Sequence, residues 1–244
     1  MPYRSLDRTK IIKTAERLEL RIGERFPKSS LRNVSTELVS LANDLAVESQ
    51  TLERPIVWLR ALIVVVIAAA GVMFGFFGTF FSFDRLAGNA SDFVQGLEAL
   101  INTAIFAAVG LYTLVTLEER IKRRRALDQL HALRSIIHII DMHQLTKDPV
   151  TGIATLKPTP SSPKRTLTPD ELKRYLDYCS ELLSITGKLA ALFAQALNDS
   201  VVVETVNDIE NLGTNLSRKI WQKIMLVPDE PKQTAKPART RKKA

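Results

Sequence analysis

Three polar residues share one face of a long apolar segment. Gln95, Glu98 and Asn102 follow one another at helical spacing within 93–117, where Glu98 is the one charged residue. A carboxylate at membrane depth faces a protein interior or a water-filled cavity by default. The pattern therefore predicts either a polar path for an ion or solute, or a hydrated or hydrogen-bonded structural glutamate. The second reading is favoured, because the apolar face continues beyond Asn102 and the preceding turn lacks the short filter sequences of two-span channels.

The other residue types that could support chemistry are sparse. His131, His138 and His143 are the only histidines, and a metal site would need a further ligand from another helix. Cys179 lies among apolar neighbours, a pattern more typical of an inert core thiol than of a nucleophile. No glycine-rich phosphate loop or nucleophile elbow is present. We therefore predict no enzyme activity, no catalytic residue, no metal and no cofactor.

The polar face belongs to one of two long apolar segments in the chain. No residue is charged in 61–83 or in 99–117, and both runs exceed the roughly 18 residues that distinguish membrane spans from buried core helices. A water-soluble single domain is excluded on this ground. We expect an integral membrane protein whose region 56–117 forms a transmembrane helical hairpin, with spans at about 57–83 and 93–117 and a turn at 84–92.

Basic residues set the expected orientation of the hairpin. Residues 118–137 contain six Lys or Arg, whereas the turn contains only Arg85. By the positive-inside rule both termini should be cytoplasmic, in a multi-pass protein of the cell inner (plasma) membrane. The basic residues next to the spans should contact lipid. These are Arg54, Arg60, Arg120, Lys122, Arg123, Arg124 and Arg125.

The net charge of +8 follows the same distribution. The excess of Lys and Arg lies beside the spans and in the C-terminal tail, and no aromatic residues are interleaved with it. Membrane lipids are therefore the expected partners, and no nucleic-acid binding is expected.

Small residues form a stripe along each span. In lipid, small residues that let backbones approach closely are typical of a helix-packing face. Two interpretations stay open and are compatible: the two spans pack on each other, or copies of the chain associate through the same face as a homo-oligomer. The face consists of Ala68, Gly71, Gly75, Gly78 and Ser82 in the first span and Gly96, Ala99, Thr103 and Gly110 in the second.

The segments flanking the hairpin read as cytoplasmic helices. Residues 1–55 contain two helix patterns, the second a coiled-coil-like seam beginning after Ser29 and ending before Pro55. The first is basic and amphipathic, so it predicts half of a helical hairpin core or an anchor lying on the bilayer. Residues 118–146 continue the second span without Pro or Gly, which allows one helix roughly 80 Å long.

The C-terminal region contains a second helical unit. A Pro-rich linker, 147–168, ends at Thr168 and Glu171, which form a capping-box pattern. Residues 169–227 predict a helical pair that must pack on other helices, because two helices alone rarely bury enough surface. Trp221 in this pair is either a core residue or a partner anchor, and 228–244 is a basic tail with a disordered composition.

These patterns together predict an all-α membrane protein of the bacterial inner-membrane type. Its expected work is binding: a self-associating scaffold with a cytoplasmic module that docks a protein partner. An oligomeric ion or solute channel, with the Gln95, Glu98 and Asn102 face near its outer mouth, is the alternative.

Overall fold

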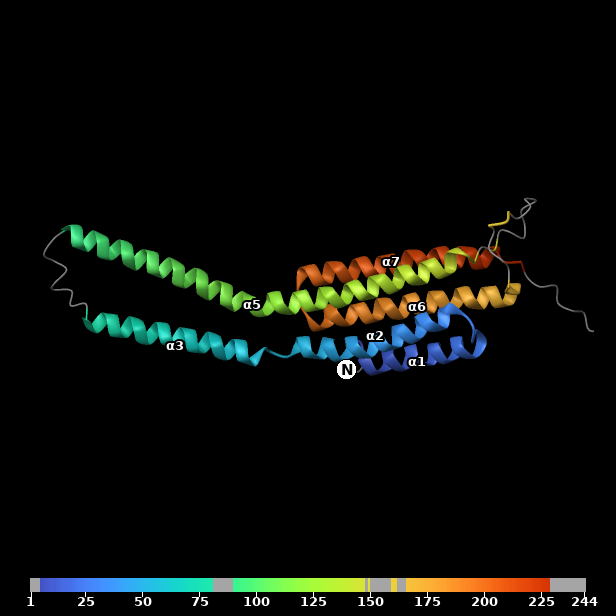
Figure 1. Cartoon of the computed structure of the whole chain (residues 1–244), viewed down its shortest axis with the longest axis horizontal. Helices are drawn as coiled ribbons and strands as arrows, with labels where there is room; N and C mark the ends of the chain where they lie inside the picture. The colour runs from blue at the N-terminus through green and yellow to red at the C-terminus, as the bar shows by residue number, and fades with distance from the viewer. Residues whose placement is uncertain (1–4, 81–89, 148, 150–158, 162–165, 229–244) are drawn as a thin grey trace, which may run out of the picture.

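The computed structural model describes residues 5–80, 90–147, 149, 159–161 and 166–228. Every regular element in these ranges is a helix. In chain order they are α1 (Arg8–Arg25), α2 (Ser30–Glu53), α3 (Val57–Phe80), α5 (Ala90–Leu145), α6 (Pro169–Ala196) and α7 (Ser200–Leu226). Figure 1 shows a bundle of α1, α2, α6, α7 and the C-terminal half of α5, and two arms, α3 and the N-terminal half of α5, leaving one end of it.

A single apolar core fills the bundle. Side chains such as Leu18, Leu38, Leu133, Phe193 and Ile220, one from each helix, are fully buried. Burying one such side chain contributes about 1.5 to 3 kcal/mol. The buried faces of α6, α7 and the C-terminal half of α5 are apolar stripes at helical spacing. As expected, the α6–α7 pair does not stand alone: it packs on α5, and α6 also packs on α1 and α2.

The apolar face of α1 is used inside this core. Ile11, Ala15, Leu18 and Ile22 are buried, while the interleaved Arg17 remains exposed. This confirms the hairpin interpretation of 1–55. The alternative of a bilayer anchor is wrong, because the residues it would insert into lipid are covered by protein.

Polar residues cap the bundle helices, at predicted places for α2 and α6. Ser29 caps α2 and Asp199 caps α7 through side-chain oxygens that accept from backbone N–H groups. Thr168 and Glu171 form the predicted capping box of α6. Pro55 follows the end of α2, as its missing N–H and its restriction of the preceding residue require.

Helix α5 starts earlier than the sequence indicated. The capping pattern predicts a start near Phe93 with Asp92 as the N-cap, but the helix begins at Ala90. From there α5 continues for 56 residues to Leu145. This is about 84 Å, so the helix that the sequence allowed runs without interruption from the arm into the bundle, with a bend where the two meet (Figure 1).

Both arms are apolar and uncovered. Among the described residues, two helices are long and apolar enough to cross a membrane, and each includes part of one arm. In their most apolar windows 6% and 0% of the residues are buried. A core helix of a water-soluble protein would be covered by its neighbours, whereas these two are not.

The arms diverge from each other away from the bundle, as Figure 1 shows. Near the base Leu59 is fully buried. Further out, a Cβ atom added at Gly71, Gly75 or Gly110 would meet nothing within 4 Å. Parts of the predicted organisation lie outside the described residues: most of the linker 147–168, turn residues 84–89, and the tail beyond Pro228.

Candidate functional site

The base of the arms is held together by Glu118, the first residue after the apolar part of α5. Its Oε1 accepts a hydrogen bond from the backbone N–H of Ile56 at 3.2 Å and pairs with Lys122 Nζ at 3.0 Å. Its Oε2 accepts from Arg60 Nε at 3.1 Å. Ile56 immediately precedes α3, so a side chain from α5 satisfies a backbone N–H at the N-terminus of α3. One carboxylate thus connects the two arms.

The electrostatics of Glu118 follow from these contacts. Its side chain is only 13% exposed, and this burial by itself raises the pKa. The hydrogen bonds from Lys122, Arg60 and the Ile56 N–H outweigh burial and lower the pKa from 4.5 to about 2. Glu118 is therefore ionised at neutral pH.

A second ion pair joins α5 to the α6–α7 turn. Arg123 donates from Nε to Asp199 Oδ2 at 2.7 Å, and its second guanidinium nitrogen lies 2.6 Å from the same oxygen. The other oxygen of Asp199 caps α7, accepting from the N–H groups of Val201 and Val202. Burial raises the pKa of Asp199, but the bonds to Arg123 and to the two amides lower it overall.

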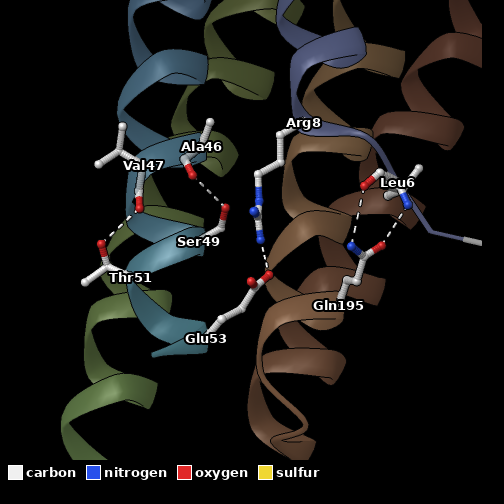
Figure 2. A network of polar contacts seen from close by, with 8 residues as sticks. All are labelled: Leu6, Arg8, Ala46, Val47, Ser49, Thr51, Glu53 and Gln195. Atoms are coloured by element: carbon white, nitrogen blue, oxygen red, sulfur yellow. Dashed lines mark hydrogen bonds and ion pairs between the residues drawn. The ribbon is translucent and has the colours of Figure 1, made fainter. Parts of the chain in front are cut away.

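A polar network closes the same end of the bundle. Figure 2 shows Arg8 of α1 reaching Glu53 of α2, with which it forms an ion pair. Gln195 of α6 holds the backbone of Leu6: its Oε1 accepts from Leu6 N–H at 2.8 Å, and its Nε2 donates to Leu6 C=O at 3.4 Å. Glu118, Asp199 and this network therefore tie α1, α2, α6 and α7 together where the arms leave.

Of the seven predicted lipid-surface basic residues, three make these intramolecular pairs. Arg60 and Lys122 bind Glu118, and Arg123 binds Asp199. The remaining four are exposed and make no ion pair with another described residue. They are Arg54, Arg120, Arg124 and Arg125.

Five positions of the predicted helix-packing face are described, and all five are exposed. Ala68, Gly71, Gly75, Thr103 and Gly110 are all exposed, and the three glycines face open space. Intrachain packing of the two spans through this face stays a prediction as well. Association between copies through the same face is equally untested. Gly78, Gly96 and Ala99 lie within α3 and α5, and Ser82 lies outside the described residues.

The predicted polar path lies on the surface of α5. Gln95, Glu98 and Asn102 are exposed along the arm, in keeping with their helical spacing. The described part of α3 provides no cover for them. The polar-path and structural-glutamate interpretations both remain predictions.

The other candidate residues have ordinary surroundings. Cys179 is fully buried, which raises the pKa of its thiol to about 12 despite Lys223 and Lys147 nearby, as the core-thiol interpretation predicts. His143 Nδ1 lies 3.1 Å from Ser30 Oγ, and no group of three potential metal ligands occurs in the described ranges. Trp221 is 54% exposed, so it is not a core residue.

The sequence reasoning missed Glu118 and Asp199. A local signal for Glu118 exists, since Lys122 follows it at the i, i+4 spacing of a helical ion pair. Its contacts with Ile56 and Arg60 span about sixty residues of chain, and no local pattern predicts them.

Comparisons with protein-family models, with curated proteins and with solved structures found no match to this chain. Function is therefore inferred from the chain's own geometry.

Proposed function

We propose that this protein is a membrane-anchored helical scaffold. Its arms cross a bilayer of the bacterial inner-membrane type as a hairpin, the bundle and both chain ends lie on the cytoplasmic side, and copies associate through the arms. The observation that carries the proposal is the contrast between the two parts. The bundle has a complete apolar core, whereas the arms expose nearly all of their apolar surface.

Lipid is the environment that suits such arms. Helix α3 has 24 residues, which span about 36 Å, and a bilayer's hydrocarbon core is about 30 Å thick. Trp58 is exposed at the base of α3, where an indole ring suits the membrane interface. The excess of Lys and Arg beside the bundle end of the arms supports the cytoplasmic side for the bundle.

Self-association accounts for surfaces of the arms that lipid alone would not stabilise. A charged side chain inside the hydrocarbon region is costly, although less so near the interface than at the centre, and Glu98 is exposed on the outer part of the α5 arm. Gly71 and Gly75 of α3 form a Gly-xxx-Gly pattern whose face is open. A second copy brings small residues against small residues and covers the polar face of α5.

Energy transfer between labelled copies in liposomes tests this association. Gly71→Leu combined with Gly75→Leu should raise the protein-to-lipid ratio at which half of the copies associate. Val72→Leu is the matched control, because Val72 is exposed on the same helix but lies off the stripe of small residues. Equal association of wild type and the double variant would refute the packing face.

An oligomeric channel is the second candidate, favoured by the uncovered face of Gln95, Glu98 and Asn102 on α5. Associated copies that turn these faces inward would enclose a polar path. Ion flux measured in liposomes separates the candidates. A flux abolished by Glu98→Ala would favour the channel, whereas association without flux supports the scaffold.

The bundle supplies the docking module of the proposal. Trp221 and Met225 lie one turn apart on α7 and are 54% and 81% exposed. An exposed tryptophan is the residue type most often found as an anchor in protein interfaces. A partner captured from cytoplasm by the full chain should be lost with Trp221→Ala and kept with Gln222→Ala, an exposed neighbour on the same helix.

A further inference from the structure

The base of the arms separates its basic residues into two groups. Arg60, Lys122 and Arg123 are held by the carboxylates of Glu118 and Asp199. Their charges are already compensated by these carboxylates. If they bound another anion instead, the contacts that join the two arms and that tie α5 to the α6–α7 turn would break. These three residues therefore have a structural role.

The second group has no such partner. Arg54, Arg120, Arg124 and Arg125 are exposed and make no ion pair within the described part of the chain; we refer to them as the free arginines. Arg54 ends α2 beside one arm, and the other three follow the second arm along α5. Arg120 and Arg124 are four residues apart, so they share one face of the helix.

The acidic residues around the free arginines only partly balance them. Glu119 and Asp128 are exposed on the same stretch of α5. Within this stretch of α5 and the end of α2, four exposed arginines stand against two exposed carboxylates, none of which forms an ion pair with a described residue. Glu53, the neighbour of Arg54, is paired with Arg8 instead.

We infer that the free arginines bind the phosphate groups of anionic lipids, and that the paired residues Arg60, Lys122 and Arg123 do not. The inference rests on the proposed membrane insertion of the arms. A guanidinium binds phosphate oxygens through two parallel hydrogen bonds, which an ammonium group cannot do. Arg120 lies about 5 Å beyond Leu117 along α5, within a headgroup layer about 5 to 8 Å thick. Arg124 lies about 10 Å beyond Leu117, just past this layer, and its long side chain can extend back to the phosphates.

The test measures which lipids remain bound to the full-length protein. The protein is equilibrated in detergent with equal amounts of phosphatidylglycerol and phosphatidylcholine, re-purified, and its bound lipids are quantified. The test variant changes Arg54, Arg120, Arg124 and Arg125 to Gln. The matched control changes four exposed bundle arginines to Gln and removes the same total charge. These are Arg17, Arg32, Arg134 and Arg218.

Wild type and the control should be enriched in phosphatidylglycerol, and the test variant should lose the enrichment. Each arginine that engages a phosphate should account for about a fivefold difference in lipid affinity. The double variant R120Q/R124Q should show an intermediate loss, and helix content from circular dichroism should not change, because none of these side chains is buried.

Three results would overturn the inference: enrichment that survives in the test variant, an equal loss in the control, or competition by a nucleic-acid duplex that displaces the anionic lipid. Failure of the underlying proposal is distinguishable. In that case the wild-type chain would not remain in sedimented liposomes of phosphatidylcholine alone, whereas failure of the inference leaves it inserted without any preference for anionic lipid.

Discussion

Glu118→Gln isolates the charge that holds the base of the arms. Glutamine keeps the shape of the side chain and an oxygen that can accept from the Ile56 N–H, but it cannot pair with Arg60 or Lys122. The pKa of Glu118 is lowered from 4.5 to about 2, which corresponds to at most about 3 kcal/mol of preferential stabilisation of the charged form. The Arg60 side chain is 62% exposed, so solvent weakens its attraction to Glu118. We therefore expect E118Q to lower the free energy of local unfolding at the base of the arms by about 2 kcal/mol.

Hydrogen exchange measured by mass spectrometry on the full chain reports this loss where it occurs. Amides at the start of α3, which follow Ile56, should exchange about 30-fold faster in E118Q, the factor that 2 kcal/mol gives. Amides of α6 and α7 should not change. Glu119→Gln is the matched control, because Glu119 is the exposed neighbour of Glu118 and makes no ion pair with a described residue.

The pH dependence has a definite sign. The pKa of Glu118 is lower in the folded protein, so its contribution is complete above about pH 4.5 and is lost as the pH falls towards 2. The difference between wild type and E118Q at equal pH should therefore disappear over this window. Equal exchange of α3 in the two proteins at pH 7, or a difference that persists unchanged at pH 2, would refute the role of Glu118.

Three further substitutions or treatments test the bundle. Gly213→Ala should stabilise it by about 0.5 to 1 kcal/mol, because alanine favours a helix interior and the added Cβ would lie 3.6 Å from the Leu183 carbonyl oxygen, an ordinary contact; a lower thermal midpoint for the alanine variant would contradict this. Asp199→Ala, which removes both the pair with Arg123 and the α7 cap, should lower stability by about 1 kcal/mol more than Asp199→Asn; identical unfolding midpoints would show that the cap contributes nothing. Cys179 should resist a thiol reagent at pH 8 and react after denaturation, since burial raises its pKa to about 12; rapid labelling of the folded protein would show that α6 is not packed as described.

The amphipathic helices could be predicted from sequence because their apolar residues repeat with the helical period. The exception within α2 is instructive. Leu31, Leu38, Leu45 and Leu52 are buried along the seam, but Ser35 and Ser49 are buried as well, whereas Leu41 is only half-buried. Serine is mostly found at the surface, so the residue type does not predict that these two serines are buried. They are tolerated because their hydroxyls donate to the backbone oxygens of Arg32 and Ala46, which leaves no unsatisfied group.

The candidate site was less accessible to sequence reasoning. Basic residues beside the spans were recognised from their spacing, but which of them are free depends on two carboxylates, Glu118 and Asp199, placed by tertiary structure. The sequence also could not predict whether the two arms pack on each other. Small residues at Gly71, Gly75 and Gly110 indicate surfaces that can approach another helix, and nothing in their spacing decides whether that helix belongs to the same chain.

The most direct test of the proposal is the side of the membrane on which each part of the chain lies. Single cysteines are introduced at Thr9, Asn89 and Ser217 of a Cys179→Ser chain and treated in intact bacterial cells with a membrane-impermeant maleimide. We predict that the cysteine at 89 is labelled directly and that those at 9 and 217 are labelled only after permeabilisation, with all the protein in the membrane fraction after alkaline carbonate washing. Release of the chain by carbonate, or labelling of 9 or 217 from outside intact cells, would contradict the account.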